Sequence, residues 1–261
     1  MQDKKVILIS PNVFSIYSIN VLNGLIEKDI HVVAILIVKL FNIKRVVEEL
    51  KRNRRSLFKR VYGKLLFREK RVLANDGRAE IAKTNLKTMA RQHHIPVHFV
   101  GSINSHEAEQ VLRKNDFDLV VFTGGGIIKS NILQLANDGV VNCHSGMLPY
   151  YRGMDCHKWA IINNEPDKVG VSCHFMTEKV DRGRLLSVHP LEIDNDDSLE
   201  RIEKKMEQLM SVEIVKAVNE YLSGKLSPVE QNIEAGKNYY TMHVTLEAIV
   251  RKKLTQLKRS A

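Results

Sequence analysis

Asn142 and His144 are the residues of this chain whose types and spacing most directly suggest chemistry. They follow the β-branched pair Val140 and Val141 and precede a turn rich in Gly, Pro and Arg, so we expect them at the carboxyl end of a strand. Side chains alternate between the two faces of an extended segment, and Asn142 and His144 therefore share one face. An amide donor beside a titratable imidazole suits a developing oxyanion and a moving proton.

The elements before this pair alternate between apolar strands and amphipathic helices. Strands are expected over residues 5–10, 31–38, 96–100, 119–123 and 139–143, and helices over 14–28, 77–93, 106–114 and 129–136. This order predicts an α/β fold with a doubly wound, mostly parallel, Rossmann-like sheet. Open sheets of this kind bind ligands at the carboxyl ends of their strands, which is where Asn142 and His144 are expected.

The second half of the chain is expected to complete the sheet and then become largely helical. The pattern predicts a helix over 155–163, strands over 169–176 and 185–193, a long helix over 198–222 and a final basic helix over 244–258. We therefore predict a catalytic domain over residues 1–195 and a small C-terminal helical region over residues 196–261. The apolar faces of the C-terminal helices make a homodimer plausible.

The composition is typical of a soluble globular protein, with 44% hydrophobic and 27% charged residues among 261. The longest apolar run, residues 32–38, is far shorter than the roughly 20 residues of a membrane span, and we expect neither a signal peptide nor an anchor. The three cysteines, Cys143, Cys156 and Cys173, lack paired spacing, which disfavours a disulfide framework and indicates the reducing cytoplasm. We expect no metal, because His157, His174 and His189 have no partner at a recognised ligand spacing.

The net charge of +10 is concentrated in one segment. Between residues 39 and 71 the chain carries almost its whole excess of lysine and arginine. This segment fits either a phosphate-rich partner or a solvated helical insertion.

Two common nucleotide sites are disfavoured by the glycine pattern. The strand ending at Ser10 is not followed by G-x-G-x-x-G, which argues against a nicotinamide dehydrogenase. Residues 124–126 are three consecutive glycines, but no Lys-Ser or Lys-Thr completes a P-loop. Those glycines fit either contact with a flat ligand or a tight turn. Cys143 should face away from its neighbours into the packing, and it is not expected to be a nucleophile.

Five short segments together resemble one enzyme family. They are Asn142-Cys143-His144, the run LPYYRG at 148–153, WAIINNE at 159–165, GVSCHFM at 170–176 and VDRG at 180–183. In order and spacing they are similar to the formyltransferases that use N10-formyltetrahydrofolate. That family includes glycinamide ribonucleotide, methionyl-tRNA and sugar-nucleotide members.

The resemblance implies a catalytic set of Asn142, His144 and Asp181. In that scheme the amine of the acceptor attacks the formyl carbon carried on N10 of the folate. Asn142 and protonated His144 donate hydrogen bonds to the oxyanion, while Asp181 supports the imidazolium and helps to relay the proton of the amine. No metal is needed.

The resemblance also implies which residues bind the two substrates. The expected contacts to the formyl donor are Thr123, Gly124, Gly125, Gly126, Ile127, Val180 and Gly183. The expected contacts to the acceptor are Tyr151, Arg152, Gly153 and Lys158. Two positions depart from many relatives, because this chain has Gly146 where they have Ser and Arg184 where they have Pro.

Several acceptors are compatible with the resemblance. Methionyl-tRNA members continue into a β-barrel domain, whereas only 68 residues follow residue 193 here and no run of short strands is expected. Purine-pathway members are shorter and lack the basic segment. By elimination we expect a nucleotide-linked amino sugar, with no membrane partner and no nucleic acid. A hydrolase of formyltetrahydrofolate and a non-catalytic nucleotide-binding module are the alternatives from other classes.

Overall fold

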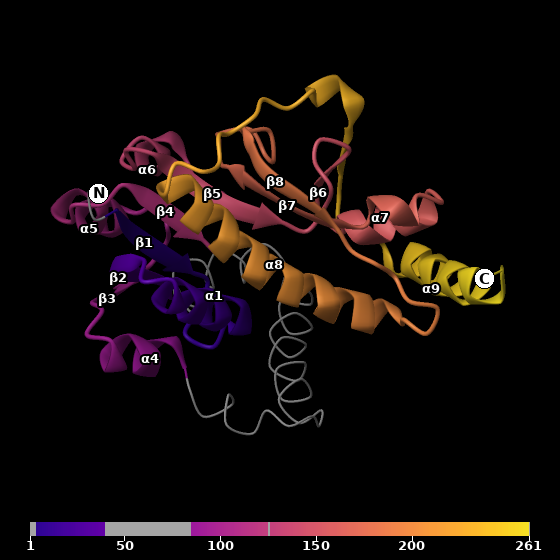
Figure 1. Cartoon of the computed structure of the whole chain (residues 1–261), viewed down its shortest axis with the longest axis horizontal. Helices are drawn as coiled ribbons and strands as arrows, with labels where there is room; N and C mark the ends of the chain where they lie inside the picture. The colour runs from indigo at the N-terminus through magenta and orange to yellow at the C-terminus, as the bar shows by residue number, and fades with distance from the viewer. Residues whose placement is uncertain (1–3, 40–84, 125, 261) are drawn as a thin grey trace, which may run out of the picture.

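The computed structural model describes residues 4–39, 85–124 and 126–260 (Figure 1). The basic segment 39–71 therefore lies outside the described residues except for Lys39, as does the first part of the helix expected over 77–93. Among the described residues, no helix has the length and apolar character needed to cross a bilayer.

A seven-stranded sheet with the order β3-β2-β1-β4-β5-β7-β8 forms the centre of the molecule. Its strands are β1 (Lys5–Ser10), β2 (His31–Val38), β3 (Val97–Val100), β4 (Leu119–Phe122), β5 (Gly139–His144), β7 (Gly170–Phe175) and β8 (Leu185–Pro190). The five strands from β3 to β5 are parallel, and the pairs β5–β7 and β7–β8 are antiparallel. This confirms the predicted α/β class with a mostly parallel sheet.

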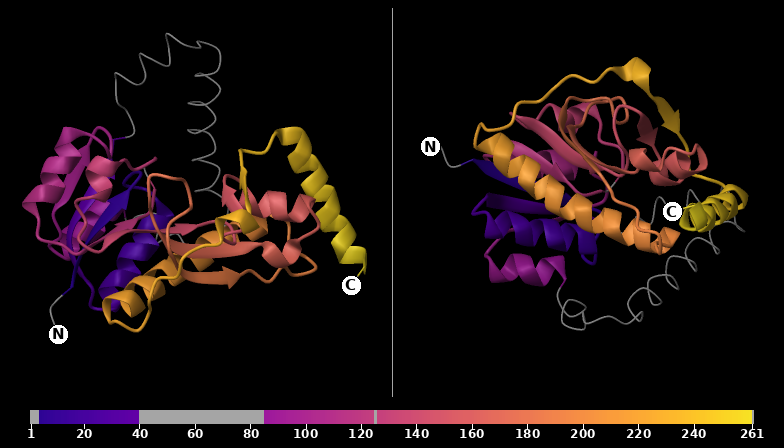
Figure 2. Two further views of the ribbon diagram at one scale, coloured as in Figure 1. Left: turned by 90° about the horizontal axis from the view of Figure 1, so that it is seen from above. Right: turned by 45° about the vertical axis from the view of Figure 1, so that its right-hand side comes forward.

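Helices cover both faces of this sheet (Figure 2). They are α1 (Ile16–Glu27), α4 (Leu86–Gln92), α5 (His106–Lys114), α6 (Ser130–Leu133), α7 (Cys156–Ile162), α8 (Leu199–Leu222) and α9 (Val244–Ser260). One apolar core lies between the sheet and α1, α4 and α8, and a second lies between the opposite face and α5 and α6. Strand β1 contributes alternate residues to each core, as a strand buried on both faces must.

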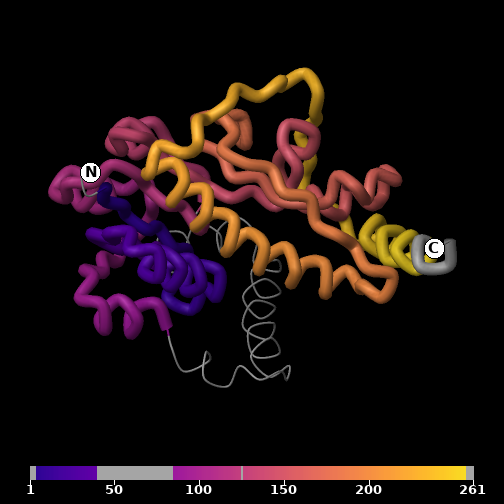
Figure 3. The backbone as a smooth tube through the Cα atoms, in the orientation of Figure 1, coloured from indigo at the N-terminus to yellow at the C-terminus, as the bar shows by residue number. Residues whose placement is uncertain are grey.

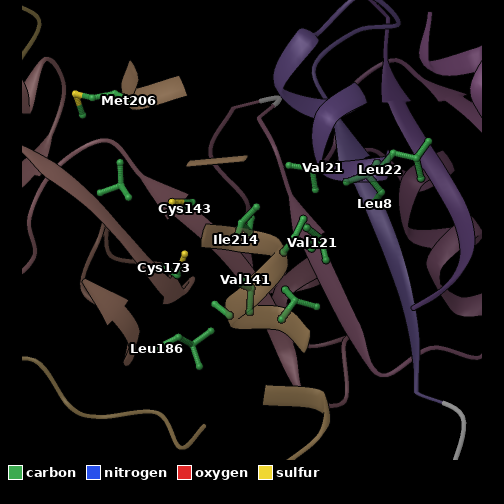
Figure 4. Close-up of a cluster of buried hydrophobic side chains, with 14 of the residues drawn as sticks. Leu8, Val21, Leu22, Val121, Val141, Cys143, Cys173, Leu186, Met206 and Ile214 are labelled. Carbon is green, nitrogen blue, oxygen red and sulfur yellow. The ribbon is translucent and has the colours of Figure 1, made fainter. Parts of the chain in front are cut away.

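The long helix α8 belongs to the larger core. Its residues Met206 and Ile214 are buried in the same apolar cluster as Val141 and Cys143 of β5 (Figure 4). Packing is thus continuous across residue 195. All three cysteines are buried and unpaired. Burial raises the pKa of the Cys143 thiol, which therefore stays protonated and inert.

Residues 226–243, which we call the C-terminal strap, connect α8 to α9. Figure 3 shows this segment arching away from α8 and returning beside α7. It contains the 3₁₀ turn η3 (Ile233–Ala235) and the strand β9 (Lys237–Tyr239), which pairs in parallel with β6 (Tyr151–Gly153). A further bridge joins Val229 to Leu185. The sequence did not predict β6 or β9, because three-residue strands carry too little periodicity to be recognised.

Helix ends explain where the other predictions shift. Helix α8 begins as expected, because the Ser198 side chain accepts a hydrogen bond from Arg201 N at 3.3 Å. Helix α6 covers only Ser130–Leu133 rather than residues 129–136. Its C-cap is Gln134, so residues 134–136 of the expected helix lie beyond its end.

The turn after β5 is fixed by one buried hydroxyl on β7. Ser172 Oγ donates to the carbonyl oxygen of Gly146 at 2.8 Å and accepts from Leu148 N at 2.9 Å. Both contacts are buried, so the turn that follows His144 is tied to the neighbouring strand.

We expect Ser172→Ala to lower the free energy of unfolding by about 2–4 kcal/mol, because two buried backbone groups lose their partner. Urea unfolding measures this change. Ser187→Ala is the matched control, since the Ser187 hydroxyl is buried on β8 with no hydrogen-bond partner among the described residues. A cost at Ser187 equal to that at Ser172 would contradict the assignment.

Candidate active site

His144 and Asp181 meet at the carboxyl end of β5. The His144 ring is buried, and its Nδ1 lies 3.5 Å from Asp181 Oδ2. On the other side of the ring, Nε2 lies 3.0 Å from the carbonyl oxygen of Tyr151. A carbonyl oxygen only accepts, so Nε2 carries the hydrogen in that contact. Any proton that His144 gains or loses must then use Nδ1, the nitrogen that faces the carboxylate.

Asn142 lies beside a second imidazole, that of His174. The two residues are register partners on the antiparallel strands β5 and β7, and Asn142 Nδ2 lies 3.4 Å from His174 Nε2. His174 Nδ1 donates to the carbonyl oxygen of Phe175 at 2.8 Å, which leaves Nε2 of the neutral ring as an acceptor. This neutral ring therefore orients the amide of Asn142 with its nitrogen toward β7.

Burial holds His174 neutral. Burial is the main cause that lowers the pKa of the imidazole, Asp181 opposes the shift and the nearby His144 adds to it, and together they bring the pKa to about 4. Its Nε2 lies 3.6 Å from Asp181 Oδ1, and the planes of the His144 and His174 rings are nearly perpendicular at 83°. Asp181 thus stands between two buried imidazoles, one on each carboxylate oxygen.

Asp181 is held in an unusual backbone conformation. Its φ of 54° lies in the left-handed region, which costs about 1–2 kcal/mol for a residue with a Cβ. The side chain is only 11% exposed, and its Oδ2 accepts a hydrogen bond from Gly153 N at 2.8 Å. The backbone of β6 therefore presents the carboxylate to His144.

Gly146 leaves the space in which His144 lies. A Cβ at this position would come within 2.7 Å of Cys156 Cβ, His144 Nε2 and Tyr151 O. A side chain here would disturb the contact between His144 and Tyr151, so the departure from many relatives has a steric consequence. The other departure, Arg184, is exposed and lies over the ring of Phe175 at 5.6 Å.

The loop after β4 is only partly available to a ligand. Thr123 is buried, and its Oγ1 donates to the carbonyl oxygen of Ile9 at 2.7 Å. Gly124 and Gly126 have φ values of 123° and 110°, and a Cβ on Gly126 would meet nothing within 4 Å. Ile127 is 68% exposed. Gly125 lies outside the described residues.

The loop that carries Asp181 offers one exposed apolar side chain and one tight turn. Val180 is 52% exposed. A Cβ on Gly183 would lie 1.8 Å from the carbonyl oxygen of Phe175, so glycine is required where the β7–β8 hairpin closes. Val180 is placed to touch a ligand, whereas Gly183 shapes the backbone.

Three of the four residues expected to contact the acceptor, Tyr151, Arg152 and Lys158, make polar contacts within the protein. Tyr151 is buried, stacks on Tyr239 with ring centroids 4.9 Å apart and donates from its hydroxyl to Glu165. Arg152 is 3% exposed and donates to Pro149 O, Ile233 O, Gly236 O and Asn238 Oδ1 at 2.7–3.1 Å. These two residues fasten the C-terminal strap to the loop after β5.

Lys158 lies in a buried charge cluster between helices. Its Nζ is 2.9 Å from Glu247 of α9, 3.4 Å from Glu203 of α8 and 3.6 Å from Asp155. These carboxylates raise the pKa of Lys158 against the effect of burial. The ammonium group of Lys158 is therefore paired with carboxylates of the protein itself. The fourth expected contact, Gly153, reaches the site through its N–H, which donates to Asp181.

Two groups of the site were not predicted from the sequence, the His174 ring and the Gly153 N–H. His174 becomes visible only when β7 is known to run antiparallel to β5, because that register sets it opposite Asn142. The role of the Gly153 N–H depends on the loop of Asp181, which is 28 residues away in sequence.

An open α/β sheet here brings an Asn, two His and an Asp together at the carboxyl end of β5, an arrangement suited to acid–base chemistry. Residues 31–218 match the model of the formyl transferase family, which is more than half of the chain. The protein therefore belongs to the formyl transferase family, and the matched range includes Asn142, His144 and Asp181.

Curated relatives share the central part of the chain. The methionyl-tRNA formyltransferase of Ehrlichia canis is 31% identical over 154 residues, which is 58% of this chain and 50% of that protein. The chain thus spans about half the length of that relative.

Solved structures share the fold over a longer range. An N-formyltransferase from Helicobacter canadensis, described in complex with folinic acid and dTDP-3-aminofucose, aligns with a TM-score of 0.60 at 15% identity, over 98% of this chain and 82% of that one. Phosphoribosylglycinamide formyltransferase from Bacillus halodurans aligns with a TM-score of 0.59 at 17% identity, over 84% of this chain and 96% of that one. These likenesses establish a common fold.

Acidification should reveal the buried neutral His174. In the unfolded chain a histidine titrates near pH 6.5, so between pH 6.5 and about 4 the unfolded state binds the proton and the folded state does not. The contribution of neutral His174 to the free energy of unfolding is fully present above pH 6.5 and is lost as the pH drops through this window. We expect His174→Asn to reduce the slope of the free energy of unfolding against pH by up to about 1.4 kcal/mol per pH unit, measured by urea unfolding at several pH values. Equal slopes in the two proteins would refute a neutral buried ring.

Arg152→Lys separates a structural role from substrate contact. An ammonium group cannot reach the four acceptors of the guanidinium, so we expect the free energy of unfolding to fall by about 2–4 kcal/mol. Arg184→Lys, at an exposed position, should cost less than about 1 kcal/mol. Unchanged stability together with a raised KM for the acceptor would instead make Arg152 a substrate contact.

Proposed function

We propose that this protein transfers a formyl group from N10-formyltetrahydrofolate to a primary amine of a nucleotide-linked amino sugar. The observation that carries the proposal is the convergence of Asn142, His144 and Asp181 at the end of β5 in a member of the formyl transferase family. Formyl transfer needs a donor for an oxyanion and an acceptor for a proton, and these three groups supply both.

The loops beside this group suit a flat donor. Gly126 leaves open space where a side chain would stand, and the exposed side chains of Ile127 and Val180 offer apolar surface at the two loops assigned to the folate. Bare backbone and apolar rims fit a fused ring that hydrogen-bonds along its edge. Of the other donor contacts assigned from the sequence, Thr123 and Gly183 are better read as supports of the loops.

The roles of the three side chains follow from their contacts. The Asn142 amide, oriented by His174, keeps a second N–H with which to donate to the oxygen of the formyl group. His144 donates from Nδ1, since Nε2 is bound to Tyr151 O. Asp181 stabilises the charged imidazole and accepts the proton that the attacking amine loses, and this proton then passes to N10 as the bond between that nitrogen and the formyl carbon breaks.

The length of the fold match supports the sugar-nucleotide acceptor. The Helicobacter canadensis enzyme, whose description includes dTDP-3-aminofucose, aligns over 98% of this chain, compared with 84% for the phosphoribosylglycinamide enzyme. The longer alignment with the Helicobacter canadensis enzyme favours a sugar-nucleotide acceptor. The phosphate contacts of such an acceptor are open to reassignment, since Arg152 and Lys158 are occupied within the protein.

Methionyl-tRNA is the second candidate acceptor, favoured by the sequence identity of 31% to the Ehrlichia canis enzyme. The two candidates differ in electrostatics, because tRNA binding weakens steeply with salt when several phosphates are neutralised. A small sugar nucleotide shows a weaker dependence.

Incubation with N10-formyltetrahydrofolate and a panel of nucleotide-linked amino sugars tests the proposal, read by the mass gain of a formyl group in place of hydrogen. We expect Asn142→Ala to lower kcat by about 10²–10³-fold and His144→Ala and Asp181→Ala by about 10²–10⁴-fold, because each removes a donor or a proton acceptor at the reacting atoms.

Asp167→Ala is the control, since this carboxylate is exposed and outside the site. Formylation of methionyl-tRNA but of no sugar nucleotide would select the second acceptor. Wild-type rates in His144→Ala or Asp181→Ala, or no rise in Tm at saturating formyl donor, would reject the assigned site.

A further inference from the structure

The backbone on both sides of Arg182 is held by one amide from the C-terminal strap. Gln231 Nε2 donates to the carbonyl oxygen of Asp181 at 3.1 Å and to that of Gly183 at 2.5 Å. Asp181 adopts the left-handed conformation with φ 54°, which a free loop would leave readily. The two hydrogen bonds of Gln231 act on the peptide groups that define this conformation.

Gln231 is itself anchored on both sides. Before it, Val229 N and Leu185 O lie 2.8 Å apart and Leu185 N and Val229 O lie 2.7 Å apart, a complete bridge to the first residue of β8. After it, the carbonyl oxygens of Ile233 and Gly236 accept from Arg152 at 3.1 and 2.7 Å. The side chain therefore extends from a fixed backbone.

The same strap also supports the group that holds the carboxylate. Gly153 N donates to Asp181 Oδ2, and Gly153 belongs to β6, whose pairing partner β9 is part of the strap. A Cβ on Gly153 would lie 2.1 Å from Tyr239 O, so the two strands approach as closely as their backbones allow. The carbonyl of Asp181 is thus bound to the strap directly, and its carboxylate is connected to the strap through Gly153.

The other atom of the Gln231 amide makes no comparable contact. Gln231 Oε1 is buried and has no hydrogen-bond partner among the described residues. A buried acceptor without a partner costs about 1–3 kcal/mol, which an apolar side chain of similar shape would avoid. The structural advantage of glutamine here therefore lies in its N–H donors.

We propose that Gln231 is a positioning residue that keeps Asp181 facing His144, so that the strap sets the geometry of the active site without touching either substrate. This inference rests on the proposed function, in which Asp181 accepts the proton of the amine. A displaced carboxylate would slow that step while leaving the binding surfaces in place.

The test compares Gln231→Ala, Gln231→Met and Asn232→Ala with the wild type. Gln231→Met keeps the length of the side chain and removes both donor and orphaned acceptor, so it tests the hydrogen bonds even where the alanine variant folds poorly. Asn232→Ala removes an amide from the next, exposed position. Two readouts are needed, kcat and KM for formyl transfer, and the amide exchange rate of Gly153 measured by NMR.

We expect both Gln231 variants to lower kcat by about 10- to 100-fold while the KM for the acceptor stays within about threefold. Exchange of the Gly153 amide should accelerate toward the rate in Asp181→Ala, which removes its acceptor altogether. Asn232→Ala should change neither quantity.

The exchange rate of the Gly153 amide tests the positioning role of Gln231 independently of the proposed function. If the wild type formylates no acceptor, the function is rejected, while faster Gly153 exchange in Gln231→Met still supports the positioning role and unchanged exchange overturns it. If the wild type is active, unchanged kcat in Gln231→Met overturns the role, as does a loss of Tm with kcat of the folded protein preserved.

Discussion

The carboxylate of Asp181 is the group on which the arrangement of the site depends. One oxygen lies near the imidazole of His144 and the other near that of His174, while the peptide N–H of Gly153 binds the first. A nearly buried negative charge is tolerated only when hydrogen bonds and neighbouring dipoles replace water. The imidazole of His144, the turn after β5, the β6–β9 pair and the C-terminal strap all contribute to that environment, whereas the neutral ring of His174 offers its Nε2 only as an acceptor. The surrounding loops therefore all contribute to the position of the Asp181 carboxylate.

Most of the sheet and its helices were predictable, because strands buried on both faces and amphipathic helices leave long regular patterns. Strands β1 and β2 occur at the residues expected from their apolar runs. The strap was not predictable as an extended segment. Its strand β9 is three residues long, and its position depends on Arg152, an interaction partner about 85 residues earlier in the chain. Single charged side chains give no periodic signal, so the sequence did not reveal that Arg152 binds the strap.

The sequence predicted that Asn142, His144 and Asp181 belong to one site, but it did not predict all of their neighbours. Asn142 and His144 were recognisable because alternation along one strand sets both on the same face. Asp181 entered the predicted set only through the resemblance, and in the structure its Oδ2 lies 3.5 Å from His144 Nδ1. The contribution of His174 required the change from parallel to antiparallel pairing at β7, since that change alone sets residue 174 opposite residue 142. Gly146 illustrates the same limit. The reason for a glycine here is the position of His144 Nε2 and Tyr151 O, which a Cβ would approach within 2.7 Å, and these positions are known only from the structure.

The strap follows every strand of the main sheet in the chain, and this order has a consequence for synthesis. The parallel strands and their helices come from the first part of the chain, and strands β7 and β8 follow them. Since chains emerge from the ribosome with the N-terminus first, the sheet can pack before residues 226–243 have been made. The left-handed turn at Asp181 gains its outer hydrogen bonds only when the strap has followed. A nascent chain would thus pass through a stage in which the sheet is formed and the backbone at Asp181 is not yet held.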